Sequence, residues 1–230
     1  ERRYAKKELN TSDLGFLAAQ KAIEDAKINP EEIDYIIFAH NFGNVKPNSS
    51  QSNLLPSLAT RVKHLLKIEN PNCVAYDILF GCPGWIQGVI QAQSFIQSKI
   101  AKKALVIGAE TLSRVIDEHD RDSMIYSDGA GACVIEGSEN NSSGIIESSE
   151  NNNSGILSHA SQTFTKDEAY YLFFDRSYNK DTTSEINYMK MHGRKIYEFA
   201  LNYVPKAMKT ALDKSGIEIN QLKKSFYPPS

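Results

Sequence analysis

Short apolar runs alternate with stretches of helical periodicity along the first 137 residues, and this alternation constrains the fold more than any other feature. Four runs have the length and the β-branched content of buried strands, at 33–40, 73–79, 103–110 and 131–136. Between the strands, apolar residues recur at helical spacing after Asn10, Leu54 and Trp85. Strands that alternate with helices are typical of α/β proteins with crossover connections. We therefore expect an α/β fold whose mixed or largely parallel central sheet is flanked by helices.

The sequence predicts three segments. Residues 1–137 form an α/β segment, in which 41–53 is polar and expected to be a loop. Residues 138–188 form a polar connecting segment, which begins with an Asn- and Ser-rich stretch that has too little apolar surface to fold alone. Residues 189–230 hold a long helix, from about Met189 to Lys214. Pro205 is expected to kink or split that helix.

Charge and apolar patterning exclude several classes of partner. The 26 Lys and Arg residues against 28 Asp and Glu residues give a net charge of −2, whereas nucleic-acid and anionic-membrane binding need a basic face. No apolar run approaches the ~20 residues that span a bilayer, and no signal peptide is visible. We expect no nucleic-acid partner and no membrane partner.

Cysteine usage indicates a reducing compartment. The three cysteines, Cys73, Cys82 and Cys133, form no Cys-x-x-Cys pair, and no histidine lies at metal-ligand spacing from one of them. Free thiols are typical of cytoplasmic proteins. We expect a cytoplasmic protein that uses no metal or redox cofactor.

Cys82 is the strongest candidate for a catalytic residue. It lies in a Gly-Cys-Pro-Gly turn between an expected strand and an expected helix, with Pro83 at the first helical position. The N-terminus of a helix carries partial positive charge and free N–H groups. Both stabilise a thiolate, and the N–H groups can also hold the oxyanion of a tetrahedral intermediate. The alternative, that Cys82 is only a small buried apolar residue, stays open at this point.

Four stretches together resemble β-ketoacyl-acyl-carrier-protein synthase III, a condensing enzyme of the thiolase superfamily. Their order and spacing fit that family over nearly the whole chain, and as a set they are specific: 77–85 (DILFGCPGW), 104–114 (ALVIGAETLSR), 120–135 (DRDSMIYSDGAGACVI) and 191–204 (MHGRKIYEFALNYV). The resemblance implies a thiolase-like fold, of which this chain holds the N-terminal α/β half and the start of the second half.

The same resemblance implies an activity and its residues. In the family the cysteine at this turn between strand and helix, here Cys82, is acylated by acyl-CoA, and the acyl group is then condensed with malonyl-carrier protein. It further implies that Arg121 contacts the adenine end of CoA, that Leu55 shapes the acyl pocket across a homodimer interface, and that the pantetheine tunnel is lined by Met191, Gly193 and Tyr197. The implied partners are acyl-CoA, as substrate and not cofactor, and acyl carrier protein.

Some features depart from the family. Pro83, Trp85 and Tyr197 replace residues that are usually smaller or phenylalanine, which leaves the acyl group open. The family's catalytic His and Asn have no match, so we expect a chain truncated at both ends with impaired condensation. The alternative function is a catalytically silent homologue that acts only as a dimerising or binding module.

Overall fold

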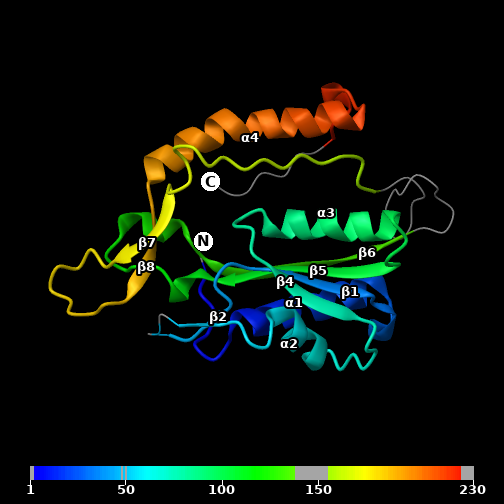
Figure 1. Ribbon diagram of the computed structural model, residues 1–230, viewed down its shortest axis with the longest axis horizontal. Helices are drawn as coiled ribbons and strands as arrows, with labels where there is room; N and C mark the ends of the chain where they lie inside the picture. The colour runs from blue at the N-terminus through cyan, green and yellow to red at the C-terminus, as the bar shows by residue number, and fades with distance from the viewer. Residues whose placement is uncertain (1–2, 48, 50, 138–154, 224–230) are drawn as a thin grey trace. The chain divides into compact units, whose positions relative to one another are not determined.

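The structure is a computed structural model that describes residues 3–47, 49, 51–137 and 155–223 (Figure 1). Parts of the expected connecting segment and of the expected second half, at 138–154 and 224–230, lie outside the described residues. The chain divides into two compact units, Glu1–Gly155 with Phe173–Lys190 and Ile156–Leu172 with Met191–Ser230. We keep the three segments predicted from the sequence as a proposal about domains.

A four-stranded mixed sheet forms the centre of the first unit, in the order β4-β1-β5-β6 (Figure 1). β1 (Tyr35–Ala39) lies between β4 (Val74–Ile78) and β5 (Lys103–Thr111) and is parallel to both. β6 (Asp128–Glu136) runs antiparallel to β5 along its whole length. The expected mixed α/β sheet is therefore confirmed.

Helices cover both faces of this sheet (Figure 1). α1 (Thr11–Ala26) and α2 (Leu58–Leu65) pack on one face, and α3 (Gly84–Gln97) packs on the other. Strands covered on both faces read as continuous apolar runs. This is why Ile36, Ile37 and Phe38 are all fully buried in the sheet.

α1 begins where short polar side chains predict it. Its N-cap Asn10 donates both its backbone N–H and its side-chain N–H to the Asp13 carboxylate, at 2.8 and 3.1 Å. The helix then approaches the sheet closely at Gly15, where a Cβ would lie 2.4 Å from Cε2 of Phe38. A side chain at position 15 would therefore push α1 away from the core.

Two expectations in the 41–66 region are wrong. The expected loop contains a short antiparallel hairpin of β2 (Asn44–Val45) and β3 (Ser52–Asn53). The helix expected from Leu54 begins only at Leu58, because a residue before proline avoids the helical region and because the Ser57 side chain accepts the N–H of Thr60 as a cap. Leu54 and Leu55, which fit the helical spacing, lie outside the helix.

Beyond β6 the described chain forms a two-stranded sheet and a long helix. β7 (Leu172–Arg176) pairs with β8 (Asn187–Met191), and α4 (Gly193–Ser215) follows. The expected helical start at Met189 is wrong, because Met189 and Met191 belong to β8. The helix is not split at Pro205, and it ends at Gly216, which has a left-handed φ of 70°.

Short 3-10 helices complete the description: Pro30–Glu32, Leu112–Arg114, Arg121–Ile125 and Ile219–Gln221. In the second unit, Phe164 packs against Phe199 and Tyr203 of α4, with ring centroids 5.3 and 4.3 Å away. None of the described helices is both long and apolar enough to cross a lipid bilayer.

Candidate active site

The structure places Cys82 in a tight turn between a strand and a helix. The turn, which we call the elbow, comprises residues 79–83 and connects β4 to α3. Gly81 has a φ of +59°, which favours glycine, and its carbonyl accepts the N–H of Gly84 at 3.2 Å. The side chain of Cys82 is exposed. The buried alternative for Cys82 is therefore wrong.

Pro83 lies one position earlier than expected. α3 begins at Gly84 and Pro83 is its N-cap, because the carbonyl of Pro83 already accepts the N–H of Gln87 at 3.1 Å. Pro83 has no N–H of its own to leave unpaired at this helix end. Cys82 is thus two residues from the first helical residue, close to the positive end of the helix dipole.

Glycines set the position of α3 on the sheet. A Cβ at Gly84 would lie 3.1 Å from Cβ of Ala39, and a Cβ at Gly88 would lie 2.8 Å from Cγ1 of Val106. The helix backbone therefore rests almost directly on β1 and β5. This close packing fixes the helix end from which the elbow projects.

Four side chains with polar or charged groups lie beside the elbow at the carboxyl ends of the parallel strands. Asn41 follows β1, and its Oδ1 accepts the N–H of Gly81 at 3.0 Å. Glu110 of β5 accepts both the backbone and the side-chain N–H of Asn41, at 2.8 and 2.9 Å. Asp77 of β4 lies 3.0 Å from the Nε2 of His40, the residue just before Asn41. No local pattern in the sequence predicts any of these residues as part of the site.

The three cysteines differ in environment. Burial raises the pKa of the Cys73 thiol to about 11, against an opposing effect of Lys63. Burial also raises the pKa of Cys133 to about 11, although a hydrogen bond with Trp85 opposes it. Both thiols stay protonated at neutral pH, which makes them poor nucleophiles. Cys82 is the exposed cysteine of the three.

Tyr126 is electrostatically coupled to the elbow. Burial raises the pKa of its phenol to about 12, and the negative charges of Cys82, Asp120 and Asp122 contribute in the same direction. The phenol stays neutral over the physiological range.

Arg121 and Leu55 are the other expected site residues of the first unit. Arg121 is the first residue of its 3-10 helix and is exposed, and the preceding Asp120 caps that helix by accepting the N–H of Asp122 at 3.0 Å. Leu55 follows β3, and its side chain is 87% exposed. An exposed cation and an exposed leucine are both free to meet a ligand or a second chain.

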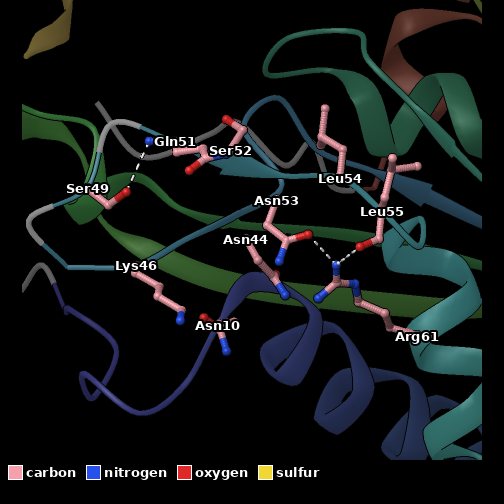
Figure 2. A pocket seen from close by; sticks show the side chains of 10 residues that line it. All are labelled: Asn10, Asn44, Lys46, Ser49, Gln51, Ser52, Asn53, Leu54, Leu55 and Arg61. Atoms are coloured by element: carbon pink, nitrogen blue, oxygen red, sulfur yellow. Dashed lines mark hydrogen bonds between the residues drawn. The ribbon is translucent and has the colours of Figure 1, made fainter.

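A polar cavity of about 660 Å³ lies beside Leu55 (Figure 2). Arg61 donates to Oδ1 of Asn53 at 2.6 Å and to the carbonyls of Leu55 and Pro56 at 2.8 and 2.9 Å. This fork of hydrogen bonds fixes the backbone that presents Leu55 (Figure 2). Neither Cys82 nor Arg121 lines the cavity, so it does not unite the expected site residues.

The expected tunnel residues all lie in the second unit. Met191 is the last residue of β8, Gly193 is the first of α4, and Tyr197 lies one turn further along, with its side chain 65% exposed. The structure thus brings these three to one end of α4. In the described part of the chain, no three His, Cys, Asp or Glu side chains come together as a possible metal site.

Sequence comparison links the elbow to one family. The profile of the 3-oxoacyl-[acyl-carrier-protein] synthase III family matches residues 76–154, which include the elbow and α3. The β-ketoacyl-[acyl-carrier-protein] synthase III of Erythrobacter litoralis is 31% identical over 213 residues, which cover 92% of this chain and 60% of the relative. That of Clostridium acetobutylicum is 34% identical over 214 residues, covering 93% of this chain and 60% of the relative.

Solved structures agree with the sequence comparison. The synthase III structure from Thermus thermophilus superposes with a TM-score of 0.70 at 30% identity, covering 94% of this chain and 61% of that one. The structure from Aquifex aeolicus has a TM-score of 0.72 at 29% identity, covering 96% and 61%. The chain spans about three fifths of the length of these relatives. Over that span the chain is similar, in sequence and in its thiolase-like fold, to the 3-oxoacyl-[acyl-carrier-protein] synthase III family.

Proposed function

We propose that this chain carries the acyl-accepting centre of a condensing enzyme, an acyltransferase of fatty-acid or related polyketide-type biosynthesis. The observation that supports this most directly is the exposed thiol of Cys82 at the positive end of α3, within the stretch that matches the family. A cysteine in this position suits attack on a thioester carbonyl, because the helix end favours both the thiolate and the oxyanion.

In the first half-reaction, the Cys82 thiolate attacks the carbonyl carbon of acyl-CoA. The carbon–sulfur bond to CoA breaks, CoA leaves as a thiol after taking up the proton that Cys82 lost, and the acyl group stays on Cys82 as a thioester. One thioester replaces another and nothing is oxidised or reduced. The step therefore requires no metal or redox cofactor, and acyl-CoA is a substrate.

In the second half-reaction, the acyl group moves from Cys82 to the carbanion that malonyl-carrier protein forms as it loses CO₂. In the family this step needs a His and an Asn, and no motif of this sequence matches them. We expect the chain by itself to acylate Cys82 but to condense weakly.

The partners follow from the resemblance. Arg121 is proposed to contact the adenine end of CoA, and Met191, Gly193 and Tyr197 to line the pantetheine tunnel. Leu55 is proposed to shape the acyl pocket of a partner subunit in a homodimer, and its 87% exposed side chain is compatible with that role. The proposed setting is the cytoplasm, where acyl-CoA and acyl carrier protein meet.

Intact-mass analysis after incubation with acetyl-CoA and with a longer acyl-CoA tests the proposal. We expect one acyl adduct on the wild type and none on Cys82→Ala. Cys133→Ala is the matched control, since it removes a half-buried thiol that is hydrogen-bonded with Trp85, and its adduct should persist. Equal labelling of wild type and Cys82→Ala would reject Cys82 as the nucleophile.

The silent-homologue alternative predicts a different pair of results. It requires a stable dimer by sedimentation and no adduct with any acyl-CoA. A dimer that forms the adduct would exclude it.

A further inference from the structure

We infer that Asn41 and Glu110 are positioning residues for Cys82: Asn41 holds the elbow, and Glu110 holds Asn41 in the orientation that this requires. The inference rests on the proposed function only in taking Cys82 as the reacting residue. Neither side chain is assigned a contact with substrate.

The strand register brings the two residues together. Ala39 of β1 pairs with Gly108 of β5, so that Asn41, two residues on, is level with Glu110. Ala39 also pairs with Ile78 of β4, which places Asn41 level with the first residues of the elbow. Parallel strands carry their carboxyl ends to the same edge of a sheet, and ligand sites commonly form there.

The contact with the elbow is a single hydrogen bond at a critical position. The N–H of Gly81 donates to Oδ1 of Asn41 at 3.0 Å. Gly81 directly precedes Cys82 and has a φ of +59°. Glycine has wide conformational freedom, and this turn is exposed. The bond to Asn41 restricts the peptide plane from which the Cys82 backbone continues.

Glu110 decides which end of the Asn41 amide faces the elbow. Its Oε2 accepts the Nδ2–H of Asn41 at 2.9 Å and the backbone N–H of Asn41 at 2.8 Å. A carboxylate can only accept these bonds, so the NH₂ end of Asn41 must face Glu110. The carbonyl end is then left to accept from Gly81.

Burial explains why Glu110 needs these partners. Burial raises the pKa of the Glu110 carboxyl, and the N–H groups of Asn41 and Phe42 oppose that rise, as does His40 nearby. A half-buried carboxylate is costly unless hydrogen bonds compensate it. The donors that compensate Glu110 come from the 41–42 segment, which ties this segment to β5.

The test compares Asn41→Ala, Glu110→Gln and the double variant. Asn41→Ala removes the acceptor for Gly81, whereas Glu110→Gln keeps the size of the side chain but turns one acceptor into a donor. Because small displacements of a reacting group are costly, we expect Asn41→Ala to slow acylation of Cys82 by acetyl-CoA by about tenfold or more. Glu110→Gln should slow it less, and the double variant no more than Asn41→Ala alone, since both act through one bond.

Asn70→Ala is the matched control. Asn70 is half-buried like Asn41 and also makes two side-chain hydrogen bonds, to the carbonyl of Glu31 and from the N–H of Asn72, away from the elbow. Asn70→Ala should lower the melting temperature about as much as Asn41→Ala does, but it should leave the acylation rate of Cys82 unchanged. A merely structural role of Asn41 would give the two variants the same rate.

A second readout separates this inference from the proposed function. Alkylation of Cys82 by iodoacetamide, followed by peptide mass spectrometry, needs no acyl-CoA site, and it should also slow in Asn41→Ala because the thiol moves from the helix end. If the wild type forms no acyl adduct, the proposed function fails while the alkylation rates still decide the positioning role. The positioning role is overturned if Asn41→Ala reacts as fast as Asn70→Ala. It is also overturned if the rate losses of Asn41→Ala and Glu110→Gln add up in the double variant. If Asn41→Ala does not fold, Glu110→Gln carries the test by itself. Acylation and alkylation rates in Glu110→Gln equal to those of the wild type would then overturn the positioning role.

Discussion

Nε2 of His40 lies 3.0 Å from Oδ2 of Asp77, and the same carboxylate accepts the backbone N–H groups of Leu58 and Ala59 at 2.7 and 2.8 Å. Nδ1 of His40 accepts the N–H of Gly43 at 3.1 Å, so the ring proton is on Nε2 and is donated to Asp77. One carboxylate thus joins the end of β1, the end of β4 and the start of α2.

Replacing Asp77 therefore uncouples three elements at once. Asp77→Asn keeps the shape but places an NH₂ group against one of its three donors, and we expect it to lower the free energy of unfolding by about 2 kcal/mol. Urea denaturation measures the loss. Asp25→Asn, on the exposed face of α1, is the control and should change little. Equal stability of the two variants would show that Asp77 does not cap α2 in solution.

Asp117 and Lys190 form a buried ion pair, with side chains 2% and 0% exposed. Burial alone would raise the pKa of Asp117, but hydrogen bonds from Lys190, Tyr178, His119 and Ser177 outweigh it and hold the pKa well below its ordinary 3.8. A carboxyl with a lowered pKa in the folded state stabilises the protein above its ordinary pKa, and that contribution is lost as the pH falls below it.

The lowered pKa of Asp117 predicts how the stability of Asp117→Asn depends on pH. Relative to the wild type, the variant should lose about 3–5 kcal/mol near neutral pH, because the buried Lys190 loses its nearest partner and keeps only the Asp120 carboxylate, 3.6 Å away. The difference should shrink as the pH falls below about 4, where the Asp117 carboxyl begins to protonate in the unfolded chain while it stays ionised in the folded one. Urea denaturation at a series of pH values measures it. A difference independent of pH would contradict an ionised Asp117.

A double-mutant cycle isolates the pair. We expect the combination of Asp117→Asn with Lys190→Met to cost clearly less than the sum of the two single variants, since it removes the buried charge of Lys190 together with that of its nearest partner. Additive losses would mean that the two side chains do not interact.

The sequence predicts the four strands of the central sheet well and their boundaries less well, but it does not predict the two small sheets, β2-β3 and β7-β8. Runs such as 33–40 are buried on both faces, so their apolar content alone identifies them, as β1 shows. Leu54 and Leu55 are misleading because they continue the helical spacing, while Pro56 and the Ser57 cap decide where α2 starts. Local turn chemistry thus overrides apolar periodicity at this helix end.

The elbow is predictable from the sequence, whereas the side chains that hold it, Asn41 and Glu110, are not. Cys82 is identified by a short local pattern, whereas Asn41 and Glu110 are 69 residues apart and meet only through the register of β1 and β5. A polar residue at the end of each parallel strand was the available signal, since such residues gather at one edge of a sheet. Whether Cys82 and the expected site residues act together stays a prediction.

Three lysines adopt backbone angles that favour glycine. Lys27, Lys67 and Lys99 have φ values of 53°, 58° and 61° just after α1, α2 and α3. Their side chains are exposed, so a replacement loses little packing. Lys27→Gly should raise the free energy of unfolding by about 1 kcal/mol, because glycine avoids the left-handed strain. Thermal or urea denaturation measures the gain, and Lys27→Ala, which keeps the strain, should not show it.

The contact between Gly88 and Val106 links packing to the position of Cys82. A Cβ at Gly88 would lie 2.8 Å from Cγ1 of Val106 and 3.4 Å from Cγ2 of Ile37. Both neighbours are β-branched and stiff, so α3 must move instead. Gly88→Ala should cost about 1–3 kcal/mol, measured by urea denaturation, and should also slow acylation of Cys82.

Two variants make that prediction specific. Gly129→Ala, at a site where a Cβ would meet nothing within 4 Å, should leave both stability and acylation nearly unchanged. Val106→Ala combined with Gly88→Ala removes the clashing methyl groups, so it should recover the acylation rate even though the lost valine side chain lowers stability further. Recovery of the rate without recovery of stability would separate the position of α3 from the strength of its packing. A rate that stays low in the double variant would show that Gly88 supports Cys82 by some means other than this contact.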